Sequence, residues 1–221
     1  LTNNGTTPAL RFNNTCYNVN NVSTVTANFS CTVDVWYFDV PGTWNITVSI
    51  NDSTTNNITN RSHSANGISL DYITIADTTA IAVSPASLTF PTATPGADNT
   101  TATPNITINN TGNHNATQGN IQLTAVNLRG ESSPAYIIPA VNFTINTSSG
   151  GSPPLQCSFG ATFANNTATA VTNATLGPGN RSAGSMEGAE ALFVCLYDTP
   201  INITGQTYSA TGVNAWTVTV N

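Results

Sequence analysis

Four cysteines are the residues of this chain best suited to covalent chemistry: Cys16, Cys31, Cys157 and Cys195. Four cysteines allow three disulfide connectivities. We favour the pairs Cys16 with Cys31 and Cys157 with Cys195, because each pair then lies within one of the two domains inferred below. The alternative is four buried free thiols. Disulfides persist in oxidising compartments, so the paired interpretation implies a protein outside the cytosol.

Asparagine is the second residue type with covalent potential, because the triplet Asn-x-Ser/Thr accepts N-linked glycans. The sequence contains 18 such sequons, whereas the reversed order Ser/Thr-x-Asn, which strand alternation would produce equally often, occurs 12 times. Half of the sequons have a polar residue or glycine in the middle, which alternation does not explain. We therefore expect several of the following residues to carry sugar: Asn4, Asn13, Asn21, Asn28, Asn45, Asn51, Asn57, Asn60, Asn99, Asn105, Asn109, Asn115, Asn142, Asn146, Asn165, Asn173, Asn180 and Asn202.

Catalytic residues are sparse. A hydrolase would need a histidine near a serine or cysteine with an acid to orient it, yet Ser62-His63-Ser64 lies in a polar stretch typical of a linker. A glycosidase would need two carboxylates beside a cleft, and we interpret the available glutamates as ordinary surface groups: Glu131, Glu187 and Glu190. The sequence therefore predicts that the protein is not an enzyme.

Metal and cofactor sites are also not indicated. The cysteines have no CxxC spacing, and neither His63 nor His114 is near a cysteine in the sequence, which argues against zinc. Asp52, Asp71 and Asp77 could ligate calcium, but the alternating Asp/Asn loop of a dedicated calcium site is missing. We expect no bound metal and no cofactor.

The composition is that of a neutral polar surface. Charged residues make up 6% of the 221 residues, and all four basic residues are arginines. Asparagine (31), threonine (38) and serine (18) replace charge as the solvating groups. A chain with net charge −6 and no basic patch is a poor partner for nucleic acid.

The sequence contains no candidate membrane span. Residues 191–197 are among the most apolar, and they are far shorter than the roughly 20 residues that a span requires. The chain starts with Leu1 rather than methionine, from which we expect that a leader peptide has been removed. Together with the sequons, these features predict an extracellular or cell-surface location.

Alternation of apolar and polar residues predicts the strands that position the cysteines and the sequon asparagines. In a strand over residues 41–52, Trp44, Ile46, Val48 and Ile50 would share one face, which we expect to point toward the core. Asn45 would lie on the opposite face, toward solvent. Similar alternation or β-rich composition predicts strands over residues 25–35, 68–75, 81–83, 105–109, 121–128, 140–145, 155–163, 167–172, 191–197 and 215–220, and a short strand over 9–12. No segment has a helical period, so we predict an all-β chain.

A polar, glycine-terminated stretch over residues 51–67 divides the chain. We predict a small β domain at 1–65 and a larger β-sandwich at 66–221. The expected architecture is a pair of immunoglobulin-like β-sandwiches, of which the N-terminal one is either small and complete or an incomplete fragment. An incomplete sandwich would expose strand edges that can pair with another chain.

A family resemblance supports this architecture. The run from Tyr37 to Asp52, with its Pro-Gly-Thr turn, aromatic residue and alternating Thr/Val/Ile, resembles the last hairpin of a PKD-type immunoglobulin-like domain. The upstream Trp-Asp-Phe-Gly-Asp-Gly run of PKD domains is absent. Residues 91–113 look like a β-sandwich module of archaeal surface proteins. The resemblance implies an archaeal extracellular or cell-surface glycoprotein with spacing or adhesion roles.

These observations favour a structural role. We expect a subunit of a glycosylated extracellular filament whose partners are copies of itself, joined when a terminal strand of one subunit completes a neighbour's sheet, with residues 1–12 as the candidate donor. Covalent N-glycans would be the other partner. A surface-layer lattice protein and a carbohydrate-binding or cell-adhesion module remain as alternatives.

Overall fold

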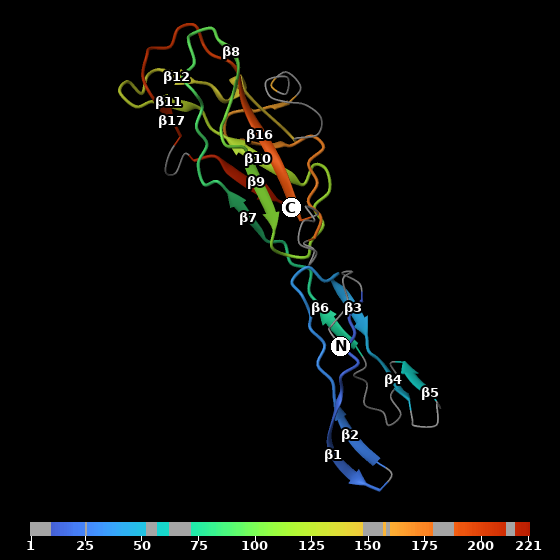
Figure 1. Ribbon diagram of the computed structural model, residues 1–221. Helices are drawn as coiled ribbons and strands as arrows, with labels where there is room; N and C mark the ends of the chain where they lie inside the picture. The colour runs from blue at the N-terminus through green and yellow to red at the C-terminus, as the bar shows by residue number, and fades with distance from the viewer. Residues whose placement is uncertain are drawn as a thin grey trace.

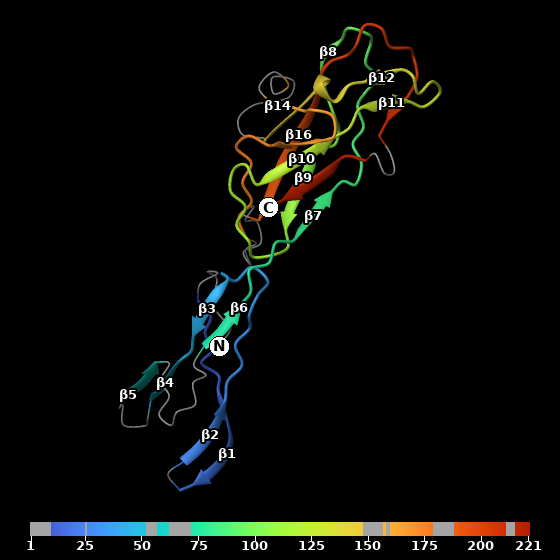
Figure 2. The ribbon, with the colours of Figure 1, turned by 180° about the vertical axis from the view of Figure 1, so that it is seen from behind.

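The protein consists of antiparallel β-strands arranged as a rounded body and a narrow arm (Figures 1 and 2). A computed structural model describes residues 10–24, 26–51, 57–61, 72–147, 157, 160–178, 188–210 and 215–221, with the backbone alone for 51 and 57–61. These residues contain no α-helix, and one short 3-10 turn, η1 (Ala140–Asn142), precedes a strand. The prediction of an all-β chain is confirmed.

The body, residues 76–221, is built on two main sheets. One sheet has the order β14-β13-β16-β9-β7, with β8 also pairing with β16: β14 (Ala161–Thr162), β13 (Phe143–Thr147), β16 (Ala189–Asp198), β9 (Ile106–Asn110), β7 (Ile81–Ser84) and β8 (Asp98–Thr101). The other has the order β15-β10-β18: β15 (Thr167–Ala170), β10 (Ile121–Ala125) and β18 (Thr217–Val220). A small third sheet forms one end: β12 (Ile137–Ile138), β11 (Leu128–Gly130) and β17 (Tyr208–Ser209).

The two main sheets bury a common core. Alternate residues of β10, Ile121, Leu123 and Ala125, are fully buried, as the two-residue period of a strand requires. They share one cluster with the inward residues of the facing sheet, among them Ile108, Phe143, Ile145, Leu192 and Val194. Two β-sheets that bury one side of each strand against the other form a closed, sandwich-like unit.

Aromatic side chains fill one region of this core. Trp216, just before β18, lies 5.3 Å from Phe143 and 5.4 Å from Phe163 between ring centroids, and Phe90 lies 5.4 Å from Phe143. The Trp216 indole nitrogen donates a hydrogen bond to the carbonyl of Val126 at 2.9 Å. The indole nitrogen is therefore satisfied, and the tryptophan holds the start of β18 against the core.

The arm, residues 10–75, contains three separate strand pairs. β1 (Tyr17–Ser23) pairs with β2 (Thr26–Ser30) at its far tip, and β3 (Gly42–Asn45) pairs with β6 (Tyr72–Ile75) next to the body (Figure 1). β4 (Thr47–Asn51) and β5 (Asn57–Arg61) form the third pair to one side. In the described residues, no strand of the arm pairs with a strand of the body.

The strand pairing indicates where the arm ends and the body begins. The predicted boundary at residues 65 and 66 lies outside the described residues. β6, which the sequence analysis assigned to the second domain, pairs with β3 of the arm, whereas β7 pairs with β9 of the body. Strand pairing therefore changes from arm to body between Ile75 and Ile81.

The prediction that the apolar face of residues 44–50 points toward a core is wrong. Ile46, Val48 and Ile50 are 44%, 48% and 60% exposed, and Trp44 is half-buried. The strand is also interrupted at Ile46, because β3 and β4 pair with different strands. Nothing in the described part of this chain covers that face, so an apolar alternation here does not mark a core.

Candidate assembly surface

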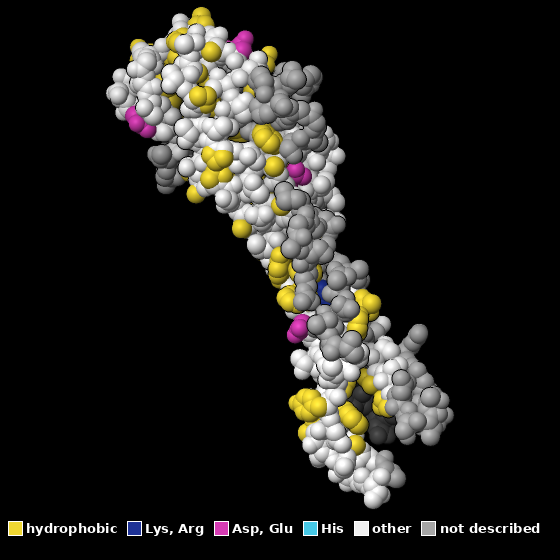
Figure 3. All heavy atoms as spheres, viewed as in Figure 1, with side chains coloured by type: hydrophobic (Ala, Val, Ile, Leu, Met, Phe, Trp, Pro, Cys, Tyr) yellow, Lys and Arg dark blue, Asp and Glu magenta, His cyan; other side chains and the backbone are white. Residues whose placement is uncertain are grey.

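The arm displays an unusual amount of apolar surface. Fifteen of the 20 exposed large hydrophobic side chains of the described residues lie in the arm, although the body contains far more residues. Figure 3 shows several of them along the narrow part of the molecule. Phe38 is the single hydrophobic residue of the described arm that is buried. The described part of the arm therefore has almost no core of its own, and exposed apolar surface of this kind is typical of interaction sites.

The outer part of the arm is a two-stranded ribbon, residues 10–35. The segment before β1 and the segment after β2 also lie side by side. Cys16 is bonded to Cys31, and the Asn13 amide donates a hydrogen bond to the Thr32 carbonyl. All seven residues of β1 are exposed, and Phe29 in β2 is 60% exposed. An isolated two-stranded ribbon is marginally stable in water, and both of its outer edges can pair with further strands.

A buried polar cluster joins the arm to the body; we call it the junction. Arg11 forms an ion pair with Asp39, and their side chains are 2% and 0% exposed. The Asp39 carboxylate also accepts a hydrogen bond from the backbone nitrogen of Trp36 at 2.8 Å, and the Arg11 guanidinium lies 5.6 Å from the centre of the Phe38 ring. A buried pair of charges needs such additional partners to offset the loss of hydration.

Asn113 supplies the body's part of the junction. Its amide nitrogen donates to the Asp39 and Ala76 carbonyls, both at 2.9 Å, and its amide oxygen accepts from the backbone of Thr78 at 2.7 Å. The neighbouring Gly112 packs so tightly that an added Cβ would lie 2.0 Å from the Thr78 oxygen. A single buried side chain thus connects the turn after β9 to two segments of the chain that lead into the arm.

Both disulfides follow the predicted connectivity. Cys16 is bonded to Cys31 in the arm, where both residues are exposed. Cys157 is bonded to Cys195 in the body, where both are buried. The second bond ties the segment at residue 157 to the central strand β16, and the Thr144 hydroxyl donates to the Cys157 carbonyl at 2.8 Å. No described cysteine is free.

The sequon asparagines lie on the outside. None of the 13 whose side chains are described is buried, whereas the two buried asparagines among the described residues, Asn110 and Asn113, are not sequon acceptors. Asn99, in β8, and Asn173, in a turn, are both exposed and have positive φ, 59° and 63°, a conformation that asparagine tolerates. The side chains of Asn4, Asn51, Asn57, Asn60 and Asn180 lie outside the described residues. Each described site is thus at least partly exposed, and at two of them Nδ2 already donates a hydrogen bond: Asn13 to the Thr32 carbonyl and Asn142 to the Asp198 carbonyl.

The weak catalytic candidates are not brought together. His114 Nδ1 lies 3.1 Å from the Asp77 carboxylate at the surface, and Glu190 accepts a hydrogen bond from the Thr175 backbone. Glu131 lines a hollow beside Arg129. His63, Glu187, Asp52 and Asp71 are outside the described residues. Within the described ranges, no three His, Cys, Asp or Glu residues are grouped as metal ligands would be.

Sequence reasoning missed the junction, because Arg11, Asp39 and Asn113 are far apart in the chain and belong to no motif. The only available signal was the rarity of charge, which makes each arginine and aspartate worth inspecting. The part of the chain that the structure describes contains no helix that could span a membrane. Comparison with protein-family models, curated proteins and solved structures finds no match to this chain, so its function is inferred from the arm, the junction and the sequons alone.

Proposed function

We propose that this protein is the structural subunit of a glycosylated extracellular filament in which the arm of one subunit pairs with a neighbouring subunit. One observation carries the proposal: an arm with exposed apolar side chains, whose described strands form only two-stranded sheets, is attached to a body that has its own core. A second copy of the chain is the partner that offers matching β-structure. Strand addition would cover the apolar side chains and satisfy the backbone groups of the edges together.

The arm and the body offer different surfaces, and this asymmetry favours a filament. When the arm of each subunit contacts the body of the next, the contact is head-to-tail, and it generates an open filament unless its rotation closes a ring. The buried junction gives every subunit the same connection between arm and body. We propose that the body is an immunoglobulin-like sandwich that acts as the repeating spacer along the fibre.

The extracellular setting is supported by the covalent chemistry of the chain. Two disulfides accord with an oxidising compartment. Accessible sequons on a surface with only 6% charged residues accord with sugar as the solvating layer. The PKD-like run at residues 37–52 and the likeness to archaeal surface modules lead us to propose a cell-surface glycoprotein of an archaeon.

Electron microscopy of material purified from its source tests the proposal. Fibres whose repeat contains one arm and one body are the expected result. A two-dimensional array would instead favour the surface-lattice alternative. Monodisperse single subunits at high protein concentration would contradict assembly in either form.

The contribution of the N-terminal segment can be tested separately. Deletion should stop at residue 9 rather than residue 12, because Arg11 is part of the junction and its removal would leave Asp39 buried without its partner. Loss of polymerisation in a folded variant lacking residues 1–9 would identify this segment as the donor strand. Retained polymerisation would assign the contact to the ribbon of residues 10–35.

A further inference from the structure

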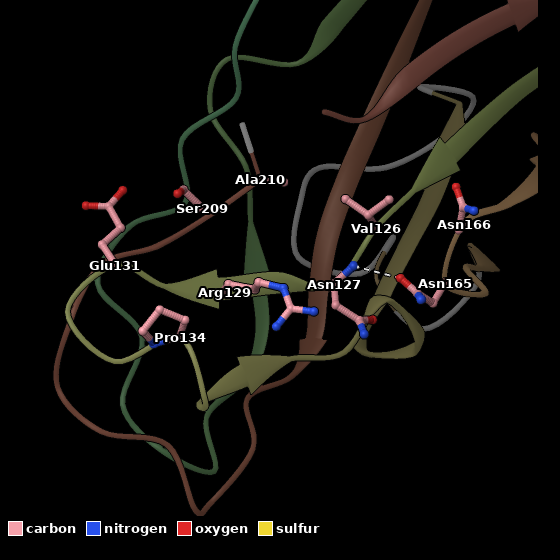
Figure 4. A pocket seen from close by; sticks show the side chains of 10 residues that line it. Val126, Asn127, Arg129, Glu131, Pro134, Asn165, Asn166, Ser209 and Ala210 are labelled. Carbon is pink, nitrogen blue, oxygen red and sulfur yellow. Dashed lines mark hydrogen bonds between the residues drawn. The ribbon is translucent and has the colours of Figure 1, made fainter. Parts of the chain in front are cut away.

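A hollow of about 550 Å³ opens at the end of the body that carries β11 and β17 (Figure 4). Its volume falls in the range of ligand pockets, roughly 300 to 1,000 Å³. The lining includes an arginine, a glutamate, three amide side chains and a hydroxyl: Arg129, Glu131, Asn127, Asn165, Asn166 and Ser209. No aromatic side chain is among the described lining residues. Val126, Pro134 and Ala210 also line it, so the hollow combines hydrogen-bond donors and acceptors with some apolar surface.

Its two charged groups are available for a ligand. Neither Arg129 nor Glu131 forms an ion pair with another described residue. In Figure 4 the Arg129 side chain extends toward Asn127, and Glu131 points away from it. A guanidinium offers five N–H donors and a carboxylate offers only acceptors, while amides offer both. Such a set suits a molecule with many hydroxyl groups, which each donate and accept a hydrogen bond.

One wall of the hollow is itself a sequon asparagine. Asn165 begins the triplet Asn165-Asn166-Thr167 in the turn before β15. Its Oδ1 accepts a hydrogen bond from the backbone nitrogen of Asn127 at 3.0 Å, which fixes the side chain against the hollow. Nδ2, the atom that would carry sugar, takes no part in this bond. Asn166 is held in the left-handed conformation (φ 55°) with its N–H bonded to the Ala125 carbonyl at 2.8 Å.

We propose that this hollow is the seat of the N-glycan attached to Asn165, whose first sugars pack against Arg129, Asn127 and Ser209. The proposal rests on the glycosylation in the proposed function. A separate transferase would form the bond between Nδ2 and the anomeric carbon of an activated sugar-phosphate donor; Nδ2 loses one proton and the phosphate leaves. A ligand tethered to the wall has an effective concentration in the millimolar range, so a few hydrogen bonds suffice to hold it.

The exposure of Arg129 to phenylglyoxal, an arginine reagent, tests the proposal on protein from the glycosylating source. Thr167→Val removes the sequon and leaves Asn165 with its bond to Asn127. The matched control is Thr111→Val, which removes the sequon of Asn109 on the exposed side of β9. Peptide mass spectrometry measures both the sugar on each asparagine and the modification of Arg129.

We expect Asn165 to be occupied in the natural protein, and the rate of Arg129 modification to rise several-fold in Thr167→Val and to stay unchanged in Thr111→Val. An unoccupied Asn165, or equal rates in all three proteins, would overturn the proposal. Protection that persists in Thr167→Val would place sugar from another site or chain in the hollow, and would overturn it as well. The labelling does not depend on polymerisation, so failure of the filament proposal would be recognised separately by microscopy.

Discussion

Removing apolar side chains from the ribbon should separate assembly from folding. The perturbation is a triple variant, Phe29→Thr, Val33→Thr and Val35→Thr, at residues that are 60%, 43% and 49% exposed. Full burial of such a side chain contributes about 1.5 to 3 kcal/mol. Since about half of each is exposed, covering all three in an assembly would contribute about 3 kcal/mol. At roughly 1.4 kcal/mol for each factor of ten, the variant should weaken each subunit contact about 100-fold.

The assay is the lowest protein concentration at which the purified subunit forms sedimentable fibres. The sequon of Asn28 is kept, because its middle position tolerates threonine, and no new sequon is created. The control is Val141→Thr with Ile201→Thr, which are 55% and 75% exposed on the body. The control should assemble like the natural protein.

Folding must be measured on the same variants. Substitution of one exposed side chain away from special contacts usually changes the free energy of unfolding by less than about 0.5 kcal/mol, so the triple variant should lose at most about 1.5 kcal/mol and the control at most about 1 kcal/mol. A triple variant that assembles normally would refute the role of the ribbon. A variant that melts much earlier would show that these residues stabilise the isolated subunit, which would refute the reasoning from exposure.

Four further outcomes are expected. A mild thiol under native conditions should reduce the exposed Cys16–Cys31 bond before the buried Cys157–Cys195 bond, as alkylation and mass spectrometry would show; replacing the latter pair by serine should lower the free energy of unfolding by up to about 4 kcal/mol, given its sequence separation of 38 residues. Asn113→Ala removes three hydrogen bonds of the junction, worth about 1 kcal/mol each, and should broaden the distance distribution in small-angle X-ray scattering; an unchanged curve would contradict the role given to Asn113. The intact mass should exceed the 22.9 kDa of the bare chain by many sugar units, and a bare mass would contradict glycosylation.

The body was largely predictable from sequence, because its strands bury residues in the same chain. The predicted segments 121–128 and 215–220 contain β10 and β18, the segment 191–197 lies within β16, and Trp216 packs against the core. The short strands β8, β12 and β17 were missed, since they have only two to four residues and no alternation long enough to recognise.

The arm was predicted less well for a physical reason. The alternation of Ile46, Val48 and Ile50 predicts a strand with one apolar face. It does not indicate whether that face is buried by the same chain or by another one. The junction could not be predicted at all. Asn113 reaches Asp39 across 74 residues, and such long-range contacts leave no local pattern.

The burial of Arg11 also governs how trypsin can attack the protein. Trypsin cleaves after lysine and arginine, and this chain has no lysine and only four arginines. Of the two whose side chains are described, Arg129 is exposed and Arg11 is enclosed by Asp39 and Phe38. Cleavage after Arg11 therefore requires its side chain to leave Asp39, so the rate at which this peptide bond is cut reports how often this buried ion pair opens.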